Sequence, residues 1–172
     1  MASRYSPPKS FLFYFGLLAV GSLWSLYEGY KSENDETTRD ESGEVIKSGE
    51  VGIFALKVGD CFQFTSDDFA SKEGNLPLSL PVVPCTDLHD GEVISVFDLP
   101  YGSYPKNYEF EKIQDEKCWE EYDLYTKTNL EEPPHLIQLY FPSEESWNDG
   151  NREVTCTVLL PDGERLGASV RG

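Results

Sequence analysis

Two histidines and four cysteines are the side chains of this sequence best suited to catalysis or metal binding. The run His89-Asp90-Gly91-Glu92 could place an imidazole and a carboxylate, three residues apart, near each other. A hydrolytic or metal site would need further ligands, or a nucleophile, in the same pocket. The sequence has no zinc-protease, nucleophile-elbow or phosphate-loop spacing.

We therefore expect a protein that is not an enzyme, with no catalytic residue, no metal ligand and no cofactor. His89 and Asp90 are expected to bond backbone groups in the turn before a strand. His135 follows Pro133 and Pro134, so we expect it in a surface loop. An enzyme or a solute-binding protein is the disfavoured alternative, because the sequence offers no complete set of reacting side chains.

The four cysteines are Cys61, Cys85, Cys118 and Cys156, an even number that predicts two disulfides in an exported domain. Their separations of 24, 33 and 38 positions are unlike zinc sites, which usually draw ligands from closely spaced pairs. Four cysteines allow three pairings, and the sequence alone leaves all three open. We favour Cys61–Cys85 and Cys118–Cys156, the latter because the helix face that carries Cys118 must dock on a neighbouring strand.

A loop rich in tyrosine, glycine and proline, Tyr101–Pro105, is the segment most typical of a recognition surface. We predict Tyr101 and Tyr104 as contacts for a partner. Trp147 is a third candidate, since tryptophan often dominates interface energetics. The alternative for Trp147, which we favour, is a buried core residue.

The elements that would position these residues alternate between strand-like and helix-like patterns. Expected strands cover residues 61–64, 82–85, 92–99, 136–141, 154–160 and 165–170, the last two joined by a turn at Pro161–Glu164. A helix is expected from Tyr108 to Tyr125, capped by Asn107. Its inner face comprises Phe110, Ile113, Cys118, Tyr122 and Tyr125. Residues 143–150 fit either a helical turn or a tight loop. This order predicts an α+β domain, a small antiparallel sheet with one main helix packed on it.

The N-terminal part of the chain has the pattern of a membrane anchor. Residues 11–27 carry no charge and, as a helix, would extend about 27 Å with residue 10 included. Arg4 and Lys9 precede them and Glu28 follows, which favours a cytoplasmic tail at residues 1–10 and an exported C-terminal part. The alternative is a signal peptide cleaved after Gly21. Residues 28–50, acidic and poor in apolar side chains, are expected to form a flexible linker to a domain at residues 51–172.

Charge restricts the possible partners. The chain carries 31 acidic and 14 basic side chains, a net charge of −17, and residues 51–172 account for −14 of it. Such a domain lacks the cations that displace counterions from phosphate backbones, and anionic lipid head groups repel it. We therefore expect no nucleic-acid partner, and contact with the bilayer only through residues 11–27.

Several short patterns occur in a fixed order: Leu56–Phe62 (LKVGDCF), Val83–Val93 (VPCTDLHDGEV), Pro142–Trp147 (PSEESW), Gly150–Arg152 (GNR) and Val154–Cys156 (VTC). Together they resemble the extracytoplasmic domain of the actinobacterial septum-formation family, over Lys57–Gly172. The resemblance implies a single-pass cell-membrane protein of an actinobacterium, linked to septation or the cell envelope, with no shared biochemical activity. We expect an interaction domain for another membrane or envelope protein. The alternative is an accessory subunit of a larger membrane complex such as the respiratory supercomplex.

Overall fold

The computed structural model describes residues 37–65 and 78–172. The predicted cytoplasmic tail and membrane anchor, residues 1–10 and 11–27, lie outside the described residues. Within the described ranges, no helix has both the length and the apolar character that crossing a membrane requires.

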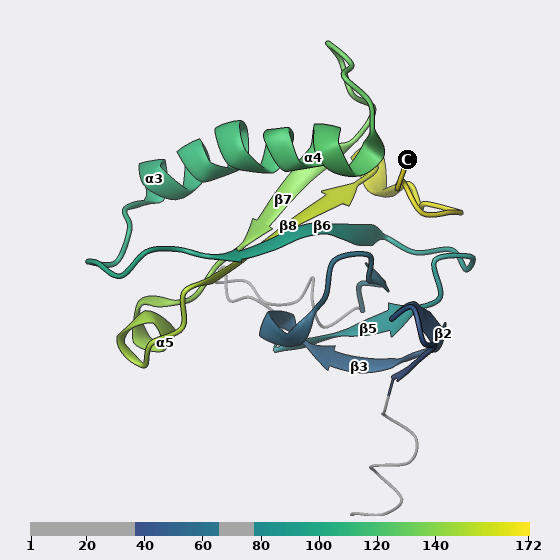
Figure 1. The fold of residues 1–172 in the computed structure, drawn as a ribbon, viewed down its shortest axis with the longest axis horizontal. Helices are drawn as coiled ribbons and strands as arrows, with labels where there is room; N and C mark the ends of the chain where they lie inside the picture. The colour runs from purple at the N-terminus through teal and green to yellow at the C-terminus, as the bar shows by residue number, and fades with distance from the viewer. Residues whose placement is uncertain (1–36, 66–77) are drawn as a thin grey trace, which may run out of the picture. The chain divides into compact units, whose positions relative to one another are not determined.

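A six-stranded antiparallel sheet forms the framework of the domain (Figure 1). Its order is β3-β5-β4-β6-β8-β7, so strands distant in sequence are neighbours at its centre. The strands are β3 (Gly49–Gly52), β4 (Cys61–Phe62), β5 (Ser79–Val83), β6 (Gly91–Asp98), β7 (Leu136–Tyr140) and β8 (Glu153–Leu159). β6 and β8 pair from Gly91↔Leu159 to Asp98↔Glu153. Five consecutive residues are buried in each strand, as in a sheet that is covered on both faces.

One long helical segment covers the β6-β8-β7 part of the sheet (Figure 1). It consists of α3 (Asn107–Lys112), a π-helical turn η2 (Ile113–Cys118) and α4 (Trp119–Thr126). The cap is Lys106, one residue before the predicted Asn107: its N–H donates to Oε2 of Glu109 at 2.8 Å. Glu109 thus closes the first turn, and its negative charge interacts favourably with the positive end of the helix dipole.

The predicted inner face of this helix is confirmed, and the π turn explains its irregular spacing. Phe110, Cys118 and Tyr122 are buried, and Ile113 and Tyr125 pack partly buried against the same core. Successive inner residues of an α-helix are three or four positions apart, but Ile113 and Cys118 are five apart. The wider turn at Ile113–Cys118 absorbs the extra residue and keeps both side chains facing the sheet.

Two hydrophobic clusters stabilise the domain. The first lies between the helix and the sheet, where the Cys118–Cys156 disulfide is fully buried and Phe110 stacks on Phe141 with centroids 3.8 Å apart. The second cluster comprises Val45, Ile53, Leu56, Phe62, Leu80, Val82, Val93 and Tyr140. Because both clusters include residues of the central strands, the sheet is buried on two sides at β6.

Order begins earlier in the chain than the sequence analysis predicted. Residues 38–50, assigned there to the flexible linker, include β1 (Thr38–Arg39), β2 (Val45–Lys47) and the first residues of β3. Two contacts supply the stabilisation that composition alone does not reveal. Arg39 binds the buried carboxylate of Asp60 with both terminal nitrogens, one of them at 2.7 Å, and Val45 is buried in the second cluster. A bidentate pair of this kind is strong and geometrically specific.

The predicted strand at residues 165–170 is wrong. Only an isolated bridge, His89↔Leu166, forms there, and Pro161–Gly163 is a short 3-10 turn, η3. The reason is topological: β8 already pairs with β6 on one side and β7 on the other, so no free edge remains for a following hairpin strand. The segment after the turn instead crosses back towards the start of β6. Between the two readings for residues 143–150, the helical turn is confirmed as α5 (Glu144–Asn148).

Candidate functional site

The loop Tyr101–Pro105 leads from β6 to the long helix and lies beside α5. One hydrogen bond holds the backbone of the loop, and a second holds the ring of Tyr104. The indole N–H of Trp147 donates to the carbonyl of Gly102 at 3.0 Å, and the hydroxyl of Tyr104 donates to the carbonyl of Pro142 at 3.0 Å. The rings of Tyr104 and Trp147 also meet edge to face, with centroids 5.8 Å apart. A loop rich in small residues is therefore held in one conformation.

Arg152 supports the same arrangement from β8's side. Its guanidinium lies 3.8 Å from the ring centre of Trp147 and 5.5 Å from that of Tyr101. It also donates to the carbonyl of Trp147 at 2.5 Å. Cation–π contact of this kind is strongest where water is excluded, and here it links the loop, α5 and the strand that follows α5.

The three predicted contact residues come together but differ in exposure. Tyr101 is 91% exposed, Tyr104 is partly buried and Trp147 is only 4% exposed. Trp147 is therefore the buried support of the loop, whereas Tyr101 is available at its surface. Tyr108, which the sequence analysis did not single out, is 61% exposed at the start of α3.

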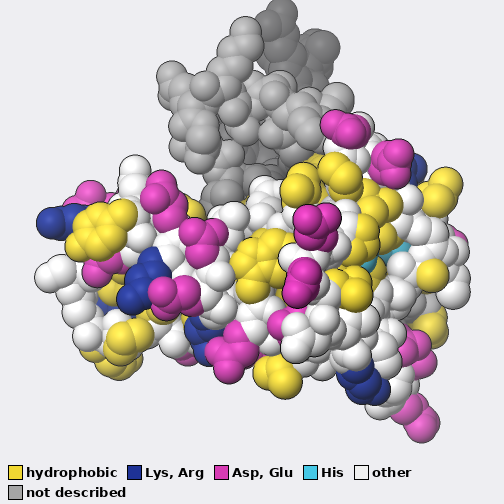
Figure 2. All heavy atoms as spheres, turned by 90° about the horizontal axis from the view of Figure 1, so that it is seen from above, with side chains coloured by type: hydrophobic (Ala, Val, Ile, Leu, Met, Phe, Trp, Pro, Cys, Tyr) yellow, Lys and Arg dark blue, Asp and Glu magenta, His cyan; other side chains and the backbone are white. Residues whose placement is uncertain are grey.

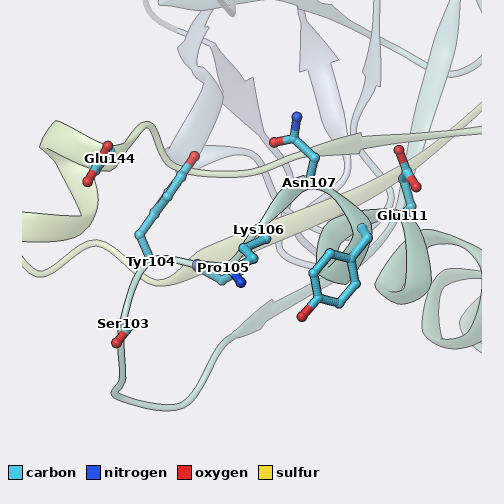
Figure 3. Close-up of a pocket in the computed structure, with 8 residues that line it drawn as sticks. Ser103, Tyr104, Pro105, Lys106, Asn107, Glu111 and Glu144 are labelled. Atoms are coloured by element: carbon cyan, nitrogen blue, oxygen red, sulfur yellow. The ribbon is translucent and has the colours of Figure 1, made fainter.

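A hollow of about 810 Å³ lies along this loop and the first turn of α3 (Figure 3). Tyr104 and Glu144 border it on the α5 side, Glu111 borders it on the helix side, and Lys106 lies between them. Tyr108 also lines the hollow. Burial raises the pKa of Tyr104, and the negative charge of Glu144 raises it further. The hollow thus combines aromatic side chains, which are enriched at interface hot spots, with two carboxylates.

The prediction that His89 and Asp90 bond backbone groups in a turn is confirmed. Nδ1 of His89 is 2.8 Å from the carbonyl oxygen of Asp87, and Oδ2 of Asp90 accepts the N–H of Phe64 at 2.7 Å. His135 lies in the loop before β7, as predicted, but its side chain is only partly exposed. Its Nδ1 is 2.7 Å from the hydroxyl of Tyr122, and burial lowers the pKa of His135.

Both favoured disulfides, Cys61–Cys85 and Cys118–Cys156, are present, with Cα–Cα distances of 5.2 and 5.7 Å. The sulfurs of the first pair and a carboxylate oxygen of Glu92 lie within 4.8 Å of one another. Because the two sulfurs are bonded to each other, they have no thiolate to offer a metal ion.

Glu92, which the sequence analysis considered only as a neighbour of His89, holds the C-terminal residues against the sheet. It lies on β6, is 0% exposed, and accepts three hydrogen bonds. The hydroxyls of Tyr125 and Ser169 donate to Oε1 at 2.5 and 2.6 Å, and the N–H of Val170 donates to Oε2 at 2.7 Å. Burial, the hydrogen bond to Glu92 and its charge raise the pKa of Tyr125 to about 12. The sequence signal for this role is an acidic residue within an otherwise apolar strand. Burying a carboxylate there costs free energy unless hydrogen-bond partners surround it.

A family model described as septum formation matches residues 31–162, more than half of the chain. No curated protein and no solved structure matches this sequence.

Proposed function

Because the chain belongs to the septum-formation family, we propose that its C-terminal domain is a protein-interaction module of the cell envelope, acting in septum formation. In this proposal residues 11–27 anchor the chain in the membrane and the domain works outside the cytoplasm. Two disulfides support that compartment, since cytoplasmic reductants keep such pairs reduced. The domain binds its partner without catalysing a reaction.

The observation that carries the proposal is the held conformation of the Tyr101–Pro105 loop. Exposed aromatic side chains on a preorganised backbone bind with little loss of conformational entropy. Here Trp147 and Tyr104 fix the loop by hydrogen bonds from buried or half-buried positions, while Tyr101 and Tyr108 project into solvent. We call Tyr101, Tyr108 and the hollow that Tyr108 lines the tyrosine surface.

Charge indicates the chemistry of the partner. The described residues contain 24 acidic and 10 basic side chains. Figure 2 shows the domain from above relative to Figure 1, and carboxylates lie between hydrophobic side chains on the face turned to the viewer. Glu111 and Glu144 line the hollow against the one cation, Lys106. A partner segment with basic and apolar side chains complements such a surface and would be steered to it electrostatically.

Site-specific photocrosslinking in cells tests the proposal on the full chain. A photoreactive amino acid at Tyr101 or at Tyr108 should crosslink to a defined envelope or membrane protein. The matched control is the same amino acid at Leu124, which is also an exposed hydrophobic residue but lies on α4, outside the tyrosine surface. Equal crosslinking from all three positions would contradict the proposal. Mass spectrometry of the product separates a septal partner from a subunit of a respiratory complex.

The variant Tyr101→Ser/Tyr108→Ser completes the test. Both side chains are exposed, so the melting temperature should stay within the small range typical of surface substitutions. Crosslinking from Leu124 should stay unchanged, and copurification of the identified partner should be lost. Retention of the partner by the double variant would refute the assignment of the tyrosine surface.

A further inference from the structure

A second hollow, of about 860 Å³, lies beside the Cys61–Cys85 disulfide, away from the residues of the tyrosine surface. Five chain segments line it: residues 42–46 of the β1–β2 turn and β2, residues 57–59, residues 84–86, Tyr125 of α4 and the C-terminal residues 167–171. Its volume is in the range of small-molecule sites, about 300–1,000 Å³. We call it the disulfide cavity.

Two cations line the disulfide cavity, Lys57 and Arg171. Neither forms an ion pair among the described residues, whereas Arg39, Lys112, Lys117 and Arg165 each do. The lining contains a single acidic residue, Glu44. A surplus of cations at one cavity is notable in a region where acidic side chains outnumber basic ones by 24 to 10. The lining side chains thus carry a formal charge of +1, opposite in sign to that of the domain, and the buried carboxylate of Glu92 lies behind Tyr125 and Ser169.

Arg171 is positioned by neighbours. Its guanidinium lies 5.0 Å from the ring centre of Tyr125. Gly59 has φ of +93°, and a Cβ at this residue would lie 2.7 Å from Nη2 of Arg171. The positive φ favours glycine at this position, and a larger residue would displace the end of the Arg171 side chain. Tyr125 is in turn held by the buried carboxylate of Glu92, so the placement of the cation depends on a chain of contacts that begins in the core.

The cavity also has an apolar wall. Ile46 and Val58, 59% and 46% exposed, are two of the large hydrophobic residues left open to solvent in the described residues, and both line this cavity. Pro84 and Ala168 extend the same wall. Apolar side chains left exposed next to unpaired cations suit a ligand that has an apolar body and an anionic group.

We infer that the disulfide cavity binds a small amphipathic anion. A carboxylate or phosphate monoester pairs with Arg171 and Lys57, and the apolar body covers Ile46 and Val58. Guanidinium groups bind such anions through charge-assisted hydrogen bonds. The ligand is a free molecule rather than the surface of an anionic bilayer, because the acidic domain as a whole is repelled by such a surface.

Isothermal titration calorimetry of the full chain in nanodiscs of neutral lipid tests this inference, with phenyl phosphate as the probe. We expect saturable one-to-one binding, with inorganic phosphate and phenol each at least about tenfold weaker, a loss of about 1.4 kcal/mol. Absence of saturable binding, or equal binding of inorganic phosphate, would overturn the inference. Nanodiscs with anionic lipid provide the second arm: unchanged affinity supports a free ligand, whereas competition by the lipid overturns that assignment.

Variants locate the binding to the cavity. Arg171→Gln and Lys57→Gln should each weaken phenyl phosphate binding at least about tenfold, and Ile46→Ser should weaken it without changing the response to inorganic phosphate. Lys106→Gln, at an exposed cation of the other hollow, is the matched control and should bind as the wild type does. Wild-type affinity in both cation variants, or an equal loss in Lys106→Gln, would refute the site. Lys57 is exposed on a turn, so its variant keeps the test valid if Arg171→Gln is destabilised.

Discussion

Replacing Glu92 by glutamine changes one atom of the buried side chain and should cost stability. The carboxylate accepts three hydrogen bonds, two at Oε1 and one at Oε2. A glutamine oxygen can still accept the N–H of Val170, but its NH₂ group must then face the hydroxyls of Tyr125 and Ser169. Both hydroxyls can rotate to accept, so the loss is mainly that of charge assistance. At about 1–1.5 kcal/mol for each of the two bonds, we expect a cost of about 2–3 kcal/mol.

Urea unfolding at neutral pH measures this cost as a lower midpoint with an unchanged denaturant slope. Tyr125→Phe is the control: it removes one donor and should cost less, about 1–2 kcal/mol. The Glu92 variant should also lower the pKa of Tyr125 from about 12 towards its ordinary value of about 10. Phenolate absorbance, compared between chains with and without Tyr125→Phe, isolates this tyrosine. Wild-type stability together with an unchanged pKa of Tyr125 would refute the role of Glu92 in holding Tyr125 and the C-terminal residues.

The remaining predictions concern the loop, one histidine, one disulfide and topology. Trp147→Ala should lower the unfolding free energy by about 3–5 kcal/mol, because a buried ring and its hydrogen bond are lost. The amides of the Tyr101–Pro105 loop should then exchange their hydrogens faster. A urea midpoint equal to that of the wild type would contradict this prediction. Burial lowers the pKa of His135, so the unfolded chain binds a proton first as pH falls through about 6.5. The unfolding free energy of the wild type should therefore decrease as the pH is lowered from about 6.5. A His135→Gln variant whose unfolding free energy shows the same pH dependence would contradict this contribution of His135. Replacing Cys118 and Cys156 by alanine should cost about 4 kcal/mol from the chain entropy of the 38-residue separation; an unchanged unfolding free energy would disprove this contribution. A phosphatase reporter fused after Gly172 should be active only outside the cytoplasm, and activity inside would reverse the proposed topology.

The elements that the sequence predicted correctly are those whose signal is local. β6, β7 and β8 are runs of β-branched and aromatic residues, and the long helix shows its inner face by spacing alone. The pairing of Cys118 with Cys156 follows from the need of that face to meet a strand. Even the five-residue interval between Ile113 and Cys118 was present in the pattern, although only the structure identifies it as a π turn.

The features that could not be predicted depend on contacts between distant parts of the chain. β1 and β2 are ordered because Arg39 reaches Asp60, 21 positions away, and composition carries no trace of that pair. Residues 165–170 have a strand-like composition but find no free edge beside β8. Glu92 and Ser169 are 77 positions apart, so the carboxylate that holds the C-terminal residues is recognisable from the sequence only as an acid in an apolar strand. The tyrosine surface was half predicted, since Tyr101 was named and Tyr108 was not.

The position of the Cys61–Cys85 bridge has a mechanical consequence. A pulling force applied at the N-terminal end of the domain would act first on β1, β2 and β3. These strands are attached through short strand pairings and the Arg39–Asp60 ion pair. Unravelling that reaches Cys61 cannot extend residues 62–84, because the covalent bond passes the force from Cys61 directly to Cys85, ahead of β6. The 24 residues 37–60 would extend to at most about 80–85 Å. The first part of the domain can thus act as an extensible tether that yields before the load reaches β6.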